Sequence, residues 1–327
     1  MRRTALTSLA LAATLALAAC GGNGDGGGTA DPTGGTEQTE GTGQTGGTAV
    51  TEAPEGLPTV DGGYGEQPTL IFPGTGAPEG LEVATLHEGD GEEVPAGSYI
   101  VANYIGQVWG AETPFNDSWD MGQPIGFSLE RVIQGWSEGI PGANVGDRLL
   151  ISIPPEQGYG AAGQPAAGIG GEDTLVFVID VLGSYPADAM YAQADARDTG
   201  EIANLPVTIS GSLGSQPTIA MAGDGAPEPT EVSATVVAEG SGEPVGEYGL
   251  IVVAYHLVSW DGQDGGSSWG AGQPETVPLG AGTPFDSLVG TPVGSRAVLQ
   301  IPAAAPNPAV AAVVDVLGYI PGVPAGN

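Results

Sequence analysis

The chain carries two copies of one sequence pattern, and this internal repeat limits the folds open to it. Gln67–Thr69 recurs as Gln216–Thr218, and the matches that follow keep an offset of 148 to 151 residues. The offset then falls to 135, where Asp180–Gly183 matches Asp315–Gly318. We therefore predict two domains of one fold, the second of which lacks about 13 residues between its last two strands.

Within the first copy, apolar runs bounded by Gly, Pro and Asp predict strands at Tyr99–Val108, Leu149–Ile153 and Leu175–Leu182. A single short helix is predicted over Val132–Ile140, where apolar residues follow helical spacing. The expected fold class is α+β, with an antiparallel sheet that wraps around one short helix in each copy.

The N-terminus is typical of a targeting segment: Arg2 and Arg3 precede an apolar stretch from Ala5 to Ala19. Cys20 follows, and the junction resembles a bacterial lipoprotein signal, in which cleavage leaves an acylated cysteine. An ordinary secretory signal with an incidental cysteine is the alternative. The prediction is a signal peptide over residues 1–19, with lipidation of Cys20 and attachment to the outer face of the cytoplasmic membrane.

Residues 21–50 contain 12 glycines and 7 threonines, and so little apolar surface that burial cannot offset the entropy cost of ordering them. We therefore expect a flexible tether over residues 20–65. The first domain is then predicted at 66–186, a linker at 187–215, and the second domain at 216–327.

The charge balance excludes nucleic acid as a partner, because six basic side chains against 39 acidic ones give a net charge of −33. The single cysteine excludes an intrachain disulfide and a multi-cysteine metal site. The two histidines lie at non-equivalent places in the repeat, so neither a metal nor a cofactor is predicted.

A specific family resemblance extends over residues Leu81–Gly183. The first copy is similar to the FKBP-type peptidyl-prolyl isomerases in the order and content of seven motifs: Ala102–Gly106, Phe115–Trp119, Val132–Trp136, Val145–Arg148, Ile153–Pro155, Gly158–Gly160 and Thr174–Phe177. The resemblance implies a half-barrel of antiparallel strands around a short helix. It also implies rotation about X-Pro peptide bonds, whose barrier is about 18–20 kcal/mol.

The resemblance also implies roles for individual residues. Trp136 would form the floor under the proline ring, flanked by Val132 and Ile133, and the Ile133 N–H would hold a substrate carbonyl. The Tyr159 hydroxyl would donate to another carbonyl from a flap that also carries Ile169. The walls of the pocket would be Tyr104, Phe115 and Phe177.

Three positions depart from the family pattern. The usual acidic residue after the pocket phenylalanine is Asn116, with Asp117 one place later; Asp117 replaces the carboxylate only if a bulge shifts the strand register, and otherwise Asn116 is a neutral wall. Ile125 replaces a usual phenylalanine and Gln164 a usual histidine. We expect a macrolide of the rapamycin type to bind with weakened affinity. Phe127 is assigned to the core.

The second copy is predicted to be degenerate and catalytically inactive. Pro284 or Phe285 falls where Trp136 stands, Gly265–Gly266 replaces Phe115 and Asn116, and the missing residues remove the flap. The resulting hypothesis is a membrane-tethered prolyl isomerase that acts on proline-containing secreted or envelope proteins through its first domain. The alternative is a non-catalytic lipoprotein that binds clients or partners through the same scaffold.

Overall fold

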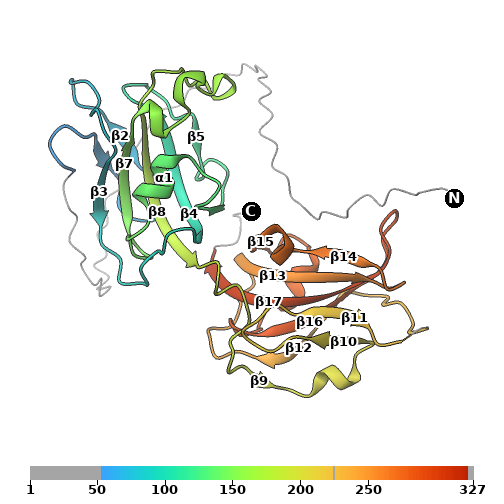
Figure 1. Cartoon of the computed structure of the whole chain (residues 1–327). Helices are drawn as coiled ribbons and strands as arrows, with labels where there is room; N and C mark the ends of the chain where they lie inside the picture. Colours follow the sequence, from blue (N-terminus) through green and yellow to red (C-terminus); the bar gives the residue numbers. More distant parts are fainter. Residues whose placement is uncertain (1–52, 224, 323–327) are drawn as a thin grey trace, which may run out of the picture.

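The structure, a computed structural model, describes residues 53–223 and 225–322, which form two sheet-based domains joined by a linker (Figure 1). The predicted signal peptide, Cys20 and most of the predicted tether lie outside the described residues. Among the residues that are described, no helix is both long and apolar enough to cross a membrane.

The first domain is built on a six-stranded antiparallel sheet in the order β3-β7-β8-β4-β5, with β6 paired to β4. One short helix, α1 (Gln134–Gly139), packs on it. The predicted strands and helix are all present: Tyr99–Val108 has the predicted ends, and the ends of the others differ from the prediction by at most three residues. The sheet strands are β3 (Glu82–His87), β4 (Tyr99–Val108), β5 (Asn116–Asp117), β6 (Ile125–Ser128), β7 (Arg148–Ile153) and β8 (Leu175–Tyr185).

The central strands are apolar on both faces because both faces of the sheet are covered. Along β7, Leu149 and Ile151 point into the cluster that contains α1, whereas Leu150 points into a second cluster on the opposite, outer face. All of β7 is buried. This explains why the strand has a continuous apolar run rather than an alternating pattern.

A hairpin of β1 (Thr59–Asp61) and β2 (Thr69–Ile71) covers the outer face, with Leu57 and Leu70 buried against the sheet. The predicted tether end at residue 65 is therefore too late: the described residues 53–65 belong to the first domain. The Gly/Thr composition that favours disorder ends at about residue 50, and Leu57 and Val60 supply apolar surface that can be buried.

A buried ion pair attaches this hairpin to the sheet. Arg148 donates to Asp180 at 2.5 Å, and both side chains are almost fully buried. The same guanidinium donates to the carbonyls of Gly62 and Glu66 at 2.6 and 2.7 Å, and the Gly65 N–H donates to Asp180. The planar guanidinium suits this role, since it offers several donors in fixed directions.

The second domain repeats this plan with a seven-stranded antiparallel sheet in the order β14-β13-β17-β16-β12-β9, with β15 paired to β13. An outer hairpin is formed by β10 (Val207–Ser210) and β11 (Thr218–Met221), and Arg296 pairs with Asp315 where Arg148 pairs with Asp180. The sheet strands are β9 (Arg197–Asp198), β12 (Ser233–Glu239), β13 (Gly249–Ser259), β14 (Asp264–Ser267), β15 (Glu275–Leu279), β16 (Arg296–Ile301) and β17 (Val310–Pro321).

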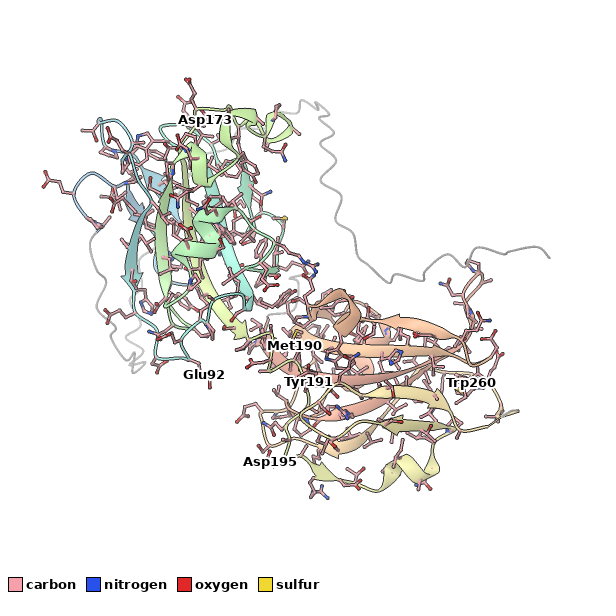
Figure 2. The ribbon with its side chains drawn as sticks, in the orientation of Figure 1. Glu92, Asp173, Met190, Tyr191, Asp195 and Trp260 are labelled. Atoms are coloured by element: carbon pink, nitrogen blue, oxygen red, sulfur yellow. The ribbon has the colours of Figure 1, made fainter. Side chains whose placement is uncertain are left out.

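The predicted linker of 187–215 is not a free connection, because β9 and β10 fall within it and belong to the second domain. Its first part packs on that domain as well: the Trp269 indole N–H donates to the Met190 carbonyl at 2.7 Å, and the Ala192 N–H donates to Asp315 at 2.9 Å. Met190 and Tyr191 are labelled at this junction in Figure 2. The folded part of the second domain therefore begins before residue 216.

The helices of the two domains differ. Where the first domain has α1, the second has a 3₁₀ helix, η5 (Pro284–Leu288), and its one short α-helix, α2 (Ser268–Ala271), follows β14 instead. Pro284 occupies the first position of η5, where the missing N–H has no intrahelical partner in any case. The segment closes i→i+3 bonds, as short helical segments commonly do. A short helix was expected at this place in each domain; in the second domain it is a 3₁₀ helix rather than an α-helix.

Candidate functional site: an aromatic cluster on the inner face of the first sheet

Trp136 lies at the centre of an aromatic cluster and is only 4% exposed. Three rings surround it edge-to-face: those of Tyr104, Phe127 and Phe177, with centroids 5.4, 5.0 and 5.3 Å away. Edge-to-face packing places the positive edge of one ring on the negative face of another, so each contact adds to simple burial. The cluster is thus a rigid apolar surface.

Two glycines allow this packing. A Cβ on Gly135 would lie 2.5 Å from the side chain of Ile153, so glycine lets α1 approach β7 closely and seats Trp136 on the sheet. A Cβ on Gly106 would lie 2.6 Å from the Phe177 ring and 2.7 Å from the Phe115 ring. Glycine in β4 therefore makes room for both wall rings.

Phe115 completes the wall of the cluster, because its half-buried ring meets Phe177 edge-to-face at 5.7 Å. The predicted floor and the three predicted walls are thus brought together by α1, β4, β8 and the start of β5. Ile125, Val132 and Ile133 are half-buried and pack against the same cluster.

The side chains of Asn116 and Asp117 face opposite ways. Tyr104 donates its hydroxyl to Asn116 Oδ1, so Asn116 lies beside the aromatic cluster. Asp117 instead accepts from the Gln67 side chain at 2.6 Å and from the Trp119 N–H at 2.8 Å, on the hairpin side of the sheet. The structure therefore does not bring Asp117 to the pocket, because its neighbour Asn116 takes the inward position on β5 and no bulge shifts the register there.

The flap between β7 and β8 consists of three 3₁₀ turns: η1 (Pro155–Gln157), η2 (Gly160–Ala162) and η3 (Pro165–Ala167). Its Tyr159 side chain is 38% exposed, whereas Ile169 is buried in the cluster that contains Trp136. Gln164 and Ile169 are joined by two backbone hydrogen bonds of 2.9 and 3.1 Å, and the Gln164 side chain is exposed. The flap thus rests on the cluster through Ile169 and leaves Tyr159 accessible.

The backbone at Ile133 has one group available for binding. The Ile133 carbonyl begins α1 by accepting from the N–H groups of Trp136 and Ser137 at 3.0 and 3.2 Å. Its own N–H makes no hydrogen bond to another described residue. A donor at the start of a helix has no intrahelical partner. It can therefore serve an external carbonyl.

Phe127, which sequence reasoning assigned to the core, is half-buried and contacts both Tyr104 and Trp136, at 5.3 and 5.0 Å. It supplies aromatic area beside Ile125, at the same face of β6. The two-residue spacing of Ile125 and Phe127 was the signal available in the sequence, because residues i and i+2 of a strand share a face.

The electrostatics of the site are those of a neutral pocket. Burial, and after it the Tyr159 hydroxyl and the Asp117 carboxylate, raise the pKa of Tyr104 to about 12. Tyr104 therefore stays protonated and can donate to Asn116 throughout the neutral range. Within residues 53–223 and 225–322, no group of three His, Cys, Asp or Glu side chains is arranged to hold a metal ion.

The equivalent surface in the second domain has lost most of its rings. Strand register places Ala312 where Phe177 stands, Gly266 where Asn116 stands and Glu275 where Ile125 stands. The Tyr255 hydroxyl donates to Glu275 at 2.7 Å, and its ring lies 6.2 Å from Phe285 in η5. One aromatic pair remains, and a carboxylate stands beside it.

The flap is also missing from the second domain. In the first domain 21 residues separate Ile153 from Leu175, whereas only 8 separate Ile301 from Val310. The short connection closes in a tight turn, in which Ala304 and Asn307 exchange backbone hydrogen bonds. No residue of this connection can take the place of Tyr159.

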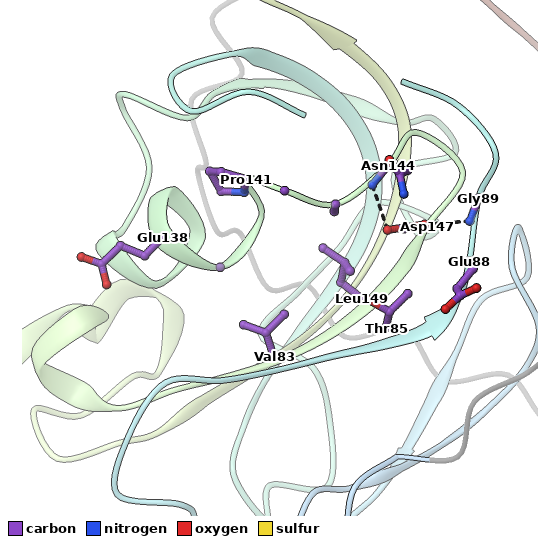
Figure 3. Close-up of a pocket in the computed structure, with 12 residues that line it drawn as sticks. Val83, Thr85, Glu88, Gly89, Glu138, Pro141, Asn144, Asp147 and Leu149 are labelled. Carbon is purple, nitrogen blue, oxygen red and sulfur yellow. Dashed lines mark hydrogen bonds between the residues drawn. The ribbon is translucent and has the colours of Figure 1, made fainter. Parts of the chain in front are cut away.

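A depression in the first domain, of about 600 Å³, lies between β3 and the loop after α1 (Figure 3). It has a mixed lining that includes Val83, Glu138 and Asp147 and none of the aromatic rings. The Asp147 carboxylate accepts from the Asn144 and Gly89 N–H groups at 2.8 and 2.7 Å. Its oxygens are therefore used to hold two loops together.

Comparison with known proteins finds relatives of the first domain. The family model of FKBP-type peptidyl-prolyl cis-trans isomerases matches residues 91–182. A probable FK506-binding protein of Corynebacterium glutamicum is 40% identical over 119 residues, which are 36% of this chain and 98% of that protein. The FK506-binding protein of Streptomyces anulatus is 35% identical over 119 residues, which are 36% of this chain and 96% of that protein. Among solved structures, FkpA from Escherichia coli is 36% identical, with a TM-score of 0.31, and the match covers 33% of this chain and 49% of that one.

The first domain thus has an antiparallel sheet around a short helix, with an aromatic cluster centred on Trp136. The chain belongs to the family of FKBP-type peptidyl-prolyl cis-trans isomerases. The prediction of this family from the motif order is confirmed, and the chain is an enzyme of the isomerase class.

Proposed function

We propose that this isomerase is a lipid-anchored folding helper outside the cytoplasmic membrane, and that its activity resides in the first domain alone. The lipoprotein-like sequence up to Cys20 supports the anchor. The loss of rings and flap in the second domain supports the restriction to the first. The substrates are proline-containing polypeptides that emerge from the secretion channel, whose X-Pro bonds isomerise in tens of seconds without help.

The proposed mechanism needs no proton transfer. Rotation about the X-Pro bond breaks the amide resonance that holds it planar, so the twisted amide is less polar than the planar one. An apolar, water-poor site therefore favours the twisted transition state over the ground state. Trp136 is the floor under the proline ring, and Tyr104, Phe115 and Phe177 are the walls.

Two donors hold the substrate chain while the bond turns. The unused Ile133 N–H binds one substrate carbonyl, and the accessible Tyr159 hydroxyl binds another from the flap. Holding both sides of the proline restricts the rotation to one bond. Ile125, Val132 and Ile169 exclude water from the rim, and Asn116 provides a neutral rather than an ionised wall, which weakens the binding of a macrolide of the rapamycin type.

The observation that carries this proposal is the edge-to-face packing of three rings around Trp136, which has no counterpart among the described residues of the second domain. The test is a cis/trans isomerisation assay on a proline peptide with the full chain and its Phe177→Ala variant. This substitution gives the first domain the residue that the second has at Ala312. We expect the wild type to accelerate isomerisation and the variant to lose at least tenfold in kcat/KM.

The matched control is Phe72→Ala, which removes an aromatic ring from the hairpin side of the same sheet. It should keep kcat/KM within about twofold. Activity that survives Phe177→Ala in a folded chain would assign catalysis to another surface. For the anchor, mass spectrometry of the chain expressed in a bacterial host should show an acylated Cys20, and Cys20→Ser should release the protein from the membrane fraction.

A further inference from the structure

The second domain packs against the part of the first domain that carries several pocket residues. Residues 125–133 run from β6 through a turn to the start of α1, and we call them the rim segment. Strand β6 pairs with β4 alone, and it contacts β15 of the second domain. The rim segment supplies four residues of the aromatic cluster and its edge: Ile125, Phe127, Val132 and Ile133.

Two polar contacts join the rim segment and its neighbouring strand to the second domain. Arg131 donates to the Ala271 carbonyl, at the end of α2, at 2.6 Å. The Tyr99 hydroxyl, on β4 opposite the end of β6, lies 2.8 Å from the Thr276 hydroxyl on β15. One contact therefore lies next to Val132, and the other lies next to β6.

Buried side chains of both domains also pack together at the interface. Tyr99 and Val101 of the first domain pack against Leu250 and Val252 of the second, and all four are buried. A Cβ on Gly126, between the two pocket residues of β6, would lie 1.9 Å from the Tyr99 hydroxyl and 2.6 Å from the Thr276 hydroxyl of the second domain. The second domain thus lies close against β6 at this glycine.

We infer that the catalytically silent second domain braces the rim segment and so keeps the proline pocket in its binding-competent form, a role that rests on the proposed function of the first domain. A four-residue edge strand with one partner, followed by a turn, opens locally at low cost unless other contacts hold it. When only a fraction of molecules is competent, the apparent affinity falls by that fraction. Arg131 is then a positioning residue.

The test compares the full chain with Arg131→Ala, Arg131→Lys and Thr276→Val. Each loss of one hydrogen bond should raise KM by roughly two- to tenfold, with kcat unchanged, because the competent form turns over normally. Lysine can still donate to the Ala271 carbonyl and should restore most of the affinity. Hydrogen exchange of the amides in residues 125–133 should become faster in Arg131→Ala and Thr276→Val, while exchange in β7 and β8 stays the same.

The control is Arg197→Ala, which removes an exposed ion pair with Glu239 inside the second domain and should change neither KM nor exchange in the rim segment. Unchanged KM and exchange in Arg131→Ala and Thr276→Val, with an active wild type, would overturn the brace but leave the isomerase. If the wild type were inactive, the proposed function would fail. Hydrogen exchange in the rim segment would then test the brace by itself: faster exchange in the variants supports the brace, and equal exchange refutes it.

Discussion

Replacing Trp136 by leucine tests the contribution of the pocket floor to activity separately from its contribution to the stability of the first domain. The substitution removes three edge-to-face contacts, with Tyr104, Phe127 and Phe177, each worth about 0.5–1.5 kcal/mol beyond burial. Leucine keeps the side chain apolar and fills part of the volume, so the cost should stay below the 3–5 kcal/mol or so of a tryptophan-to-alanine change. We expect a loss of about 2–4 kcal/mol in the free energy of unfolding of the first domain.

The same substitution should reduce kcat/KM by about 10- to 100-fold, since the flat ring under the proline is replaced by a narrower side chain. A loss of that size corresponds to about 1.4–2.7 kcal/mol of transition-state stabilisation. The assay is isomerisation of a proline peptide, and stability is followed by urea unfolding with far-UV circular dichroism as the signal. Hydrogen exchange in β7 and β8 establishes that the variant is folded under the assay conditions.

Trp119→Leu is the matched control, because Trp119 is a half-buried tryptophan on the hairpin side of the same sheet. Its ring contacts the outer apolar cluster, and its indole N–H donates to the Gly65 carbonyl at 3.4 Å. This variant should lose some stability and keep kcat/KM within about twofold. Equal losses of activity in Trp119→Leu and Trp136→Leu, or full activity in a folded Trp136→Leu, would refute the assignment of the pocket floor.

Three further predictions concern the hairpin and pH. Arg148→Met leaves Asp180 buried without its partner and should lower the free energy of unfolding, measured in urea, by about 3–5 kcal/mol. Adding Asp180→Leu should recover most of that loss. An Arg148→Met variant as stable as the wild type would contradict this prediction. Gln67→Ala removes a donor to a buried carboxylate, Asp117, and should destabilise the first domain by about 1.5–3 kcal/mol, while Gln67→Glu should cost more by repulsion. Tyr104 has a pKa of about 12 in the folded chain against about 10 in the unfolded chain. The stability that the protonated Tyr104 contributes is therefore complete below pH 10 and is lost as the pH rises toward 12. In Tyr104→Phe, the free energy of unfolding should fall less steeply above about pH 10.

Sequence reasoning found the elements whose signal is local. Tyr99–Val108 is a strand in the structure as predicted, because a run of apolar residues of that length needs no knowledge of its partners. The absence of the flap from the second domain was also visible in the sequence, because the change of offset between the two repeats gives the length of the missing segment directly. Trp136 and Tyr159 could be proposed because their motifs are short and contiguous.

The features that were missed depend on contacts between distant segments. The hairpin at residues 59–71 has two three-residue strands with too little periodicity to be recognised, and the Arg148–Asp180 pair that fixes it joins residues 32 positions apart. Whether Asn116 or Asp117 faces the rings depends on the pairing of a two-residue strand with β4, which the sequence leaves undetermined. Phe127 belongs to both the core and the pocket because α1 places Trp136 against its ring.

The buried Arg296–Asp315 pair is a feature that the second repeat shares with the first. Such a pair is expensive to dehydrate, and burial raises the pKa of Asp315 despite its partner. Apolar residues could replace such a pair with little loss of stability, yet the pair is present in a repeat that lacks the flap and most of the rings of the first. In the second domain the pair also reaches the outer hairpin, since Arg296 donates to the Ser215 carbonyl at 3.0 Å, between β10 and β11. The two domains therefore share the device that fastens the hairpin to the sheet and differ in the surface on the other face.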